Sequence, residues 1–309
     1  MRLGRVVRDR AARSIMGVLT LSIILLVPLM ILALSMRAKP ILASRSIGDL
    51  IFSSTWQPQS GAFGLYPFIM GTLAVTGVSM VIAVPTCLLT ATYLAEYAPV
   101  QIRKITKPLI DLLAGIPSVV FGIWGVLTVV PFVQRHVVPI VGHNLGFIPF
   151  FKSNNPTGYS VMAGGVVLAV MVFPIIISIA EEVIRSVPHG LREASLALGA
   201  TRWQTIKFVL LPLALPGVAA SVVLGFSRAF GETMAVLMVV GNVPQVPRSI
   251  FDAAYPLTAL IANNYGEVMS IPLYDAALLG AALVLFLIVL IFNITSRLVL
   301  VKMFRVEKA

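Results

Sequence analysis

The stretch that decides the fold is EASLALGATRWQTIKFVLLP, residues 193–212, a charged amphipathic run between two long apolar segments. Glu193, Arg202 and Lys207 stand among apolar residues in this run. A charged side chain in hydrocarbon costs about 2.5–3.5 kcal/mol on an insertion scale, so we expect the run to lie outside the bilayer, in water or against another protein. The apolar segments on either side are then predicted to be membrane spans.

The rest of the chain has the composition of a membrane protein. Of its 309 residues, 58% are hydrophobic and 11% are charged, whereas soluble domains have about 25% charged residues. Six apolar windows reach the ~20 residues that a helix needs to cross the hydrocarbon. The sequence therefore predicts an all-α integral membrane protein with six transmembrane helices, at about residues 15–35, 67–94, 108–133, 159–180, 213–240 and 272–296.

These spans divide the chain into four parts: a basic amino-terminal segment (1–14), a first helix with an external loop (15–66), a core of five helices (67–296) and a tail (297–309). The amino-terminal apolar run is longer than the core of a usual signal peptide, so we expect it to remain as the first span. Cys87 is the single cysteine, and we interpret it as a small packing residue.

The basic residues indicate how the chain is oriented. Most of the 23 Lys and Arg residues cluster within 2–13, 103–107, 185–207 and 297–308. With six spans these four segments share one side, and an excess of Lys and Arg marks the cytoplasmic side. We therefore expect both termini and residues 185–212 in the cytoplasm. The same bias accounts for the net charge of +11. We therefore expect the chain to contact membrane lipid, and we expect no nucleic-acid partner.

Two charges fall inside a predicted span. Arg228 and Glu232 are four residues apart and would share one face of a helix. One interpretation is a structural ion pair, although Arg before Glu is the less favourable order within a helix. The other is transport, because a guanidinium binds a tetrahedral oxyanion through bidentate charge-assisted hydrogen bonds. In that hypothesis Glu232 holds Arg228 while the passage is empty.

The charged run has a helical pattern of its own. Ala194, Ala197, Leu198 and Thr201 recur at helical spacing and predict a small, flat face that fits a groove on a partner. Gly199 permits a turn or a close backbone approach there. The alternative interpretation is an amphipathic helix that lies on the bilayer surface.

Upstream, Pro117 and Ser118 follow Gly115-Ile116 within a predicted span. This pattern indicates a bend or a helix restart, which acts either as a packing kink or as a gate.

The residues favour neither a metal site nor an enzyme. His136 and His143 have no acidic companion at ligand spacing, and we find no cluster of His, Asp or Cys within the spans. The chain also has no phosphate cradle of the P-loop type, so any ATP hydrolysis belongs to a separate chain. We expect no metal and no cofactor.

The charged run resembles the EAA loop of ABC-importer permeases at Glu193-Ala194-Ser195, at Gly199 and at Leu211-Pro212, which ends the motif. Ser195 stands where the motif has Ala, a small-for-small change that we expect to have no effect. The resemblance implies coupling to a separate ATPase, and we call residues 185–212 the coupling segment. The coupling residues are expected to be Glu193, Ala194, Ser195, Gly199, Ala200 and Thr201.

Three further motifs narrow the resemblance: LAGIPSVVFG at 113–122, RAFGETMAV at 228–236 and Gly-Asn at 241–242. They are similar to the permease subunits of phosphate-specific ABC importers, and the GETMAV form resembles the PstC-type subunit. The resemblance implies an importer permease bundle in a bacterial inner membrane that passes phosphate inward by alternating access. We assign Arg228, Glu232 and Thr233, which lie in the second of these motifs, to the substrate passage.

The same resemblance implies three partners: a second permease subunit of the PstA type, a dimer of cytoplasmic ATPases and an external phosphate-binding protein. Two alternatives remain open on the residues alone. One is an importer for another oxyanion such as sulfate, molybdate or tungstate, because one Arg and one Glu do not distinguish tetrahedral anions. The other is an ion-coupled secondary transporter with Glu232 as its proton site.

Overall fold

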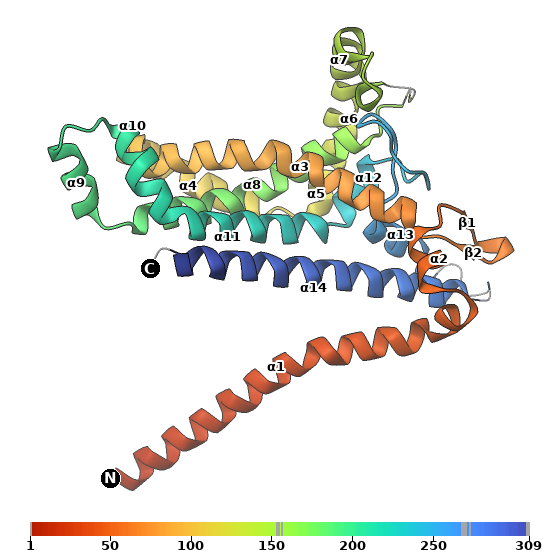
Figure 1. Ribbon diagram of the computed structural model, residues 1–309, viewed down its shortest axis with the longest axis horizontal. Coiled ribbons are helices and arrows are strands. Elements are labelled where there is room, and N and C mark those ends of the chain that lie inside the picture. Colours follow the sequence, from red (N-terminus) through yellow and green to blue (C-terminus); the bar gives the residue numbers. More distant parts are fainter. Residues whose placement is uncertain (1, 153–154, 156, 267–270, 272, 307–309) are drawn as a thin grey trace.

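The computed structural model describes residues 2–152, 155, 157–266, 271 and 273–306. The described chain is helical apart from its connections and one two-stranded ribbon (Figure 1). Six of its helices are long and apolar enough to cross a membrane, which confirms the predicted all-α architecture and the number of spans. These are Asp9–Ser44, Tyr66–Tyr97, Ser118–Leu145, Val161–Ser186, Arg202–Phe230 and Tyr274–Val299.

The first helix leaves the bundle. Helix α1 (Arg2–Ser44) is longer than the predicted span 15–35, and its apolar residues 15–30 are exposed and lie apart from the bundle (Figure 1). Near its carboxyl end, Ala38 and Ile41 are fully buried, where α1 packs on α14 (Tyr274–Val306). The exposed apolar stretch 15–30 therefore has the surface expected of a helix in lipid.

The connection after α1 is a small folded unit. It contains α2 (Ile47–Phe52) and an antiparallel pair of strands, β1 (Trp56–Gln57) and β2 (Ala62–Phe63). The ring of Trp56 makes edge contacts with Phe63, Phe68 and Tyr274. This aromatic cluster attaches the loop to the beginnings of α3 (Tyr66–Thr92) and α14.

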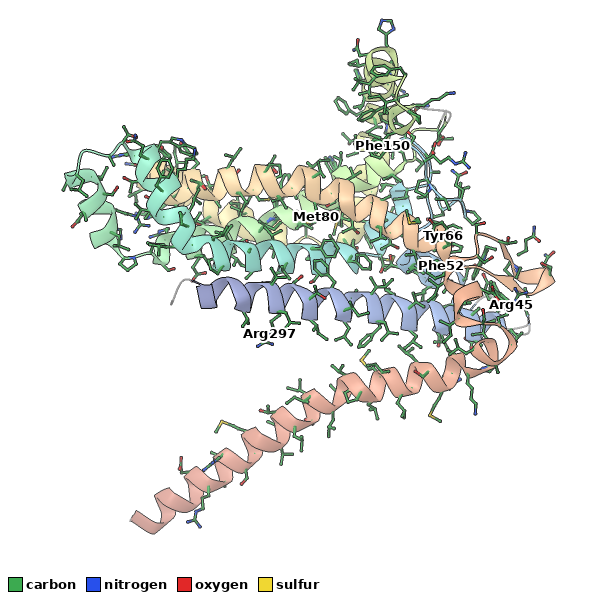
Figure 2. The ribbon with its side chains drawn as sticks, viewed as in Figure 1. Arg45, Phe52, Tyr66, Met80, Phe150 and Arg297 are labelled. Carbon is green, nitrogen blue, oxygen red and sulfur yellow. The ribbon has the colours of Figure 1, made fainter. Side chains whose placement is uncertain are left out.

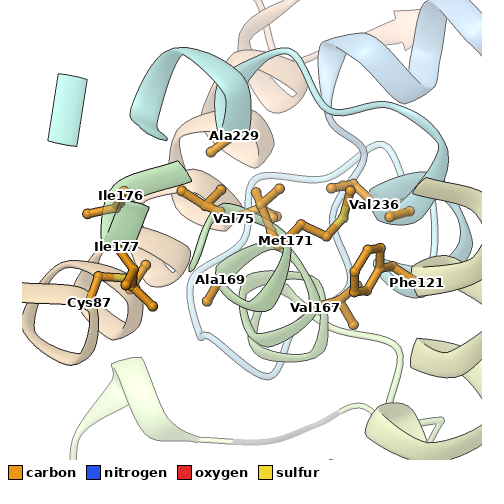
Figure 3. Packing of buried hydrophobic residues seen from close by; sticks show 14 of the residues in the cluster. Val75, Cys87, Phe121, Val167, Ala169, Met171, Ile176, Ile177, Ala229 and Val236 are labelled. Carbon is orange, nitrogen blue, oxygen red and sulfur yellow. The ribbon is translucent and has the colours of Figure 1, made fainter. Parts of the chain in front are cut away.

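The core lies where α3, α8 (Val161–Ser186) and α11 (Leu211–Phe230) pack together. Residues 161–180 of α8 carry no charged side chain and are mostly buried, which is typical of a central helix. Figure 3 shows Met171 of α8 among Val75 of α3 and Ala229 of α11. In the same cluster Cys87 is fully buried near Ile177, in agreement with a packing role.

The third span is displaced from its prediction. An amphipathic helix, α4 (Val100–Gly115), ends at the predicted bend, and a helical run then continues to Leu145. The predicted bounds of the third span, 108–133, were therefore wrong at both ends. The basic residues on either side of 108–133 favoured loops there, although exposed basic side chains are equally compatible with a helix surface. The run comprises α5 (Ser118–Trp124), α6 (Val130–Phe132) and α7 (Val138–Leu145), joined by π-helical turns at Gly125–Val129 and Val133–Val137.

The fifth span is broken and the sixth is extended. Helix α11 ends at Phe230, and a short helix, α12 (Met234–Val239), follows after three non-helical residues. The predicted continuous helix 213–240 is therefore wrong. After α13 (Leu257–Asn264), helix α14 continues past the predicted end at residue 296; the predicted start, Pro272, lies outside the described residues.

The coupling segment lies at one end of the bundle. The amino-terminal end of α1, the carboxyl-terminal end of α14 and the coupling segment share this end (Figure 1). Side chains mark the two ends in Figure 2, where Arg297 lies toward this end and Arg45 and Phe52 lie at the other.

Candidate functional site

The first candidate site is the helix break that separates α11 from α12. Gly231 closes α11, and Glu232 and Thr233 lie outside both helices. The backbone of the break is held by hydrogen bonds. Glu232 N donates to Ala229 O at 3.3 Å, and the hydroxyl of Thr258 in α13 donates to Glu232 O at 2.9 Å. The break is thus a supported feature of the fold.

Arg228 and Glu232 are not placed as their spacing predicted. Because α11 ends between them, they do not occupy successive turns of one helix. Within the part of the chain that the structure describes, the ion pairs do not include one between these residues. The interpretation of Arg228–Glu232 as a resting ion pair is therefore wrong for this structure.

The two side chains have different surroundings. Arg228 is exposed on the last turn of α11. Glu232 is half-buried, and its Oε1 accepts a hydrogen bond of 3.1 Å from the backbone N–H of Thr233. Glu232 therefore stabilises the break, while the Arg228 guanidinium is presented at the surface of this chain.

A small cavity of about 10 Å³ adjoins the break. Its polar lining comes from Thr72 and Thr76 of α3, from Thr258 and from Glu232. Thr72 also accepts a hydrogen bond of 2.9 Å from Leu257 N at the start of α13. Helix α3 therefore contacts both the break and the helix that supports it.

The last turn of α11 is attached to α14 as well. Ser227 Oγ donates to Asn293 Oδ1 at 3.0 Å, and the rings of Phe226 and Phe292 stack with centroids 3.8 Å apart. These contacts hold the helical turn that carries Arg228. Sequence reasoning missed Asn293, whose signal was a polar amide within an apolar span.

The coupling segment forms a helix–turn–helix. Helix α9 (His189–Ala197) is followed by an exposed turn and by α10 (Arg202–Thr205). Thr201 caps α10 through a capping box with Gln204. The polypeptide then enters α11 through a π-helical turn, Ile206–Leu210. The side chains of Glu193 and Ala194 on α9 are exposed, as a docking surface requires.

The turn corrects the predicted helical face. Gly199 has φ +85°, a left-handed conformation that ends the helix. Ala194 and Ala197 lie on α9, whereas Leu198 and Thr201 lie beyond it, so the four residues do not share one helical face. Leu198 is instead 89% exposed at the tip of the turn. Ala200, next to Gly199, is half-buried.

Ser195 has a contact that an alanine cannot make. Its Oγ lies 2.9 Å from Oγ1 of Thr205, a buried residue of α10, so a hydrogen bond joins the two helices across the turn. The expectation that Ser in place of Ala has no effect did not foresee this contact. The hydroxyl closes the helix–turn–helix.

The predicted bend at Pro117 and Ser118 is present. Helix α4 ends at Gly115, Ile116 and Pro117 are extended, and α5 begins at Ser118. Among the described residues, no group of three or more His, Cys, Asp or Glu side chains is placed to hold a metal ion.

Comparisons with solved structures identify the fold. Two crystal forms of the inward-facing MetNI methionine ABC transporter match with TM-scores of 0.54 and 0.56, at 22% and 21% sequence identity. The first covers 75% of this chain and 93% of the solved chain, and the second covers 77% and 95%. The six spans, the broken fifth span and the helix–turn–helix thus define a multi-pass membrane protein with an ABC-importer permease fold.

The chain belongs to the family of binding-protein-dependent transport system inner membrane components, whose signature matches residues 87–305. A probable ABC transporter permease, YqgH of Bacillus subtilis, is 41% identical over 81% of this chain and 78% of its own length. The phosphate transport system permease protein PstC of Haemophilus influenzae is 37% identical over 83% and 82%. PstC of Mycobacterium leprae is 37% identical over 76% and 75%. The resemblance to PstC-type permeases is confirmed, and this chain is a transport subunit.

Proposed function

We propose that this chain is the PstC-type permease subunit of an ATP-driven phosphate importer in a bacterial inner membrane. Its similarity to several proteins named as phosphate transport permeases supports the substrate class. The structural observation that carries the proposal is Arg228, an exposed cation in a candidate membrane span, beside a helix break.

The position of Arg228 is informative because an intramembrane charge is expensive. At about 2.5–3.5 kcal/mol on an insertion scale, such a residue faces a wet cavity or a partner rather than lipid. A guanidinium in a passage with little water offers paired N–H donors to the oxygens of phosphate. Thr233 adds a hydroxyl near the break, and Glu232 keeps the break in place through its bond to Thr233 N.

The proposed assembly has four kinds of chain. A second, PstA-type permease completes the passage, a dimer of cytoplasmic ATPases docks on the coupling segment, and an external phosphate-binding protein delivers the substrate. Closure of the ATPases moves the coupling segment, and the passage opens outward and then inward. Reversing the populations of the two states from 99:1 to 1:99 takes about 5.5 kcal/mol of differential binding, which ATP and the docked binding protein supply together.

Pro117 and Ser118 are proposed to act as a gate, because they lie at the break that separates α4 from α5, the start of the third span. Glu193, Ala194, Ser195, Gly199, Ala200 and Thr201 are proposed to form the surface that docks on the ATPase, with both termini on the same cytoplasmic side.

The test is uptake into proteoliposomes that contain the full complex. We expect ATP-dependent phosphate uptake that sulfate and molybdate do not inhibit. Preferential uptake of another oxyanion would favour that substrate class instead. Uptake that follows a proton or sodium gradient without ATP would contradict the proposal and favour a secondary transporter.

A further inference from the structure

One ion pair connects the coupling segment to a distant part of the chain. Arg192 of α9 and Glu96, which lies in the π-helical turn Tyr93–Tyr97 after α3, are 96 residues apart in sequence. Arg192 Nη2 lies 2.8 Å from Glu96 Oε1, and Arg192 Nε lies 3.0 Å from the same oxygen. Their side chains are only 12% and 13% exposed. This is a well-formed, largely buried contact rather than a loose surface pair.

The same guanidinium also binds the end of α8. Nη2 donates to Ile184 O at 2.9 Å, and Nη1 donates to the carbonyl of Val187, the residue that caps α8. Carbonyls at the end of a helix have no partner within the helix and attract positive charge. One side chain of α9 is therefore bonded to both α8 and the end of α3.

The position of these bonds matters because they cross a joint. Between the last residue of α8 and the first residue of α9 stand only Val187 and Pro188, both extended. Pro188 fixes its own φ and holds Val187 in the extended region, so α9 can change its angle to α8 only through the few remaining backbone rotations of these two residues. Arg192 reaches back across this joint and binds the far side, so α9 cannot tilt independently while the bonds persist.

Helix α3 leads from this joint toward the helix break. It packs along α8, and its 27 residues span ~40 Å at 1.5 Å per residue. Its other half carries Thr72 and Thr76, which line the cavity beside Glu232. A displacement applied to Glu96 thus acts on a helix whose far half borders the proposed passage.

We propose that the Glu96–Arg192 pair transmits movement of the coupling segment to α3 and α8, so that these helices and α9 move as one body. Arg192 and Glu96 are positioning residues in this mechanism, since neither contacts the substrate. The inference rests on the proposed function. It gives the movement of the coupling segment a second route into the bundle, besides the covalent connection through α10 and α11.

The experiment uses the complete complex in proteoliposomes and measures phosphate transported per ATP hydrolysed. Arg192→Lys keeps the charge but removes the planar fork, and Glu96→Gln keeps the shape but removes the charge. We expect each variant to retain ATP hydrolysis stimulated by the binding protein, while phosphate per ATP falls about tenfold, within the usual range for coupling between sites. The double variant is expected to lose no more than the single variants, because both remove one link.

Arg185→Lys is the matched control. Arg185 pairs with Glu181 at 3.5 Å within α8, so weakening that pair severs no connection between elements. We expect its ratio of phosphate to ATP to be unchanged.

Several outcomes would overturn the inference. Unchanged coupling in Arg192→Lys and Glu96→Gln would show that the pair transmits nothing. Failure of both variants to assemble would show that the pair serves folding, and an equal loss in Arg185→Lys would show a general effect of replacing arginine at this end of the bundle. A wild-type complex without ATP-driven phosphate uptake would instead contradict the proposed function. That result is distinct from one in which the wild type transports and the variants remain coupled.

Discussion

The hydroxyl of Thr258 donates a hydrogen bond of 2.9 Å to the backbone carbonyl of Glu232. Thr258 is 7% exposed and belongs to α13, whereas Glu232 lies in the break between α11 and α12. A carbonyl in a helix break lacks the partner that a continuous helix supplies. This single side chain therefore supports the break from another element.

Replacing Thr258 with Val is expected to weaken the break. The change keeps the shape but leaves the Glu232 carbonyl without its partner, at a cost of about 1–3 kcal/mol. Thermal unfolding of the purified complex should occur at a lower temperature, and phosphate uptake should slow. Thr86→Val is the control, because the exposed Thr86 hydroxyl bonds only within its own helix. Equal stability of the two variants would contradict the supporting role.

Replacing Arg228 with Ala should abolish phosphate uptake while the complex still assembles. Charge-assisted hydrogen bonds contribute about 1.5–3 kcal/mol each, so losing two lowers the rate more than about a hundredfold. Arg228→Lys should retain part of the activity, because it keeps the charge without the fork. Arg37→Ala removes a positive charge from an exposed site on α1 and is expected to leave uptake unchanged. Normal uptake in Arg228→Ala would rule out the passage role.

Replacing Gly199 with Ala should impair coupling through the backbone. A left-handed conformation costs an L-residue about 1–2 kcal/mol, and Gly199 has φ +85°, although an added Cβ would meet no atom within 4 Å. Asn tolerates this region better, so Gly199→Asn should be milder. Gly190→Ala within α9 also meets open space but has no positive φ, and it should be neutral. ATP hydrolysis and uptake, measured together, check the order of the three variants.

Replacing Gly225 with Ala should loosen the packing of α11 on α8. The new Cβ would lie 2.6 Å from Ile176 Cγ1 and 2.9 Å from Val172 Cγ1, both fully buried residues. Overpacking costs about 1–3 kcal/mol, which outweighs the ~1 kcal/mol that Ala gains over Gly in a helix. In Gly77→Ala on α3 the new Cβ meets no atom within 4 Å, so this variant should show only the stabilisation that Ala gives over Gly in a helix. Thermal unfolding in detergent should therefore move in opposite directions for the two variants.

Replacing Ser195 with Ala should destabilise the helix–turn–helix modestly. The buried hydroxyl of Thr205 loses its partner, which costs about 1–3 kcal/mol. Thr205→Val added to Ser195→Ala removes both hydroxyls and should recover most of the loss. Proteolysis of the assembled complex near this turn measures the effect. Additive losses in the double variant would show that the two hydroxyls act separately.

Much of the architecture was predictable because it depends on local hydropathy. The transfer free energy of a segment is close to a sum over its residues, so six apolar windows predicted six spans. The same argument separated the charged coupling segment from its apolar neighbours. The bend at Pro117 was predictable as well, because proline restricts its own backbone and that of the preceding residue.

The sequence by itself determined the helical class, the number of spans and the position of the coupling segment, since each follows from residues close together in the chain. Only the tertiary structure decided that α11 ends before Glu232, that Ser195 bonds to Thr205 and that Arg192 pairs with Glu96. Each of these depends on partners from other elements, such as Thr258 at the break. Helical spacing predicted that Arg228 and Glu232 share a face. Hydrogen bonds from α13 and within the break instead support a different backbone path. This path separates the exposed cation of Arg228 from the Glu232 carboxylate, which stabilises the break.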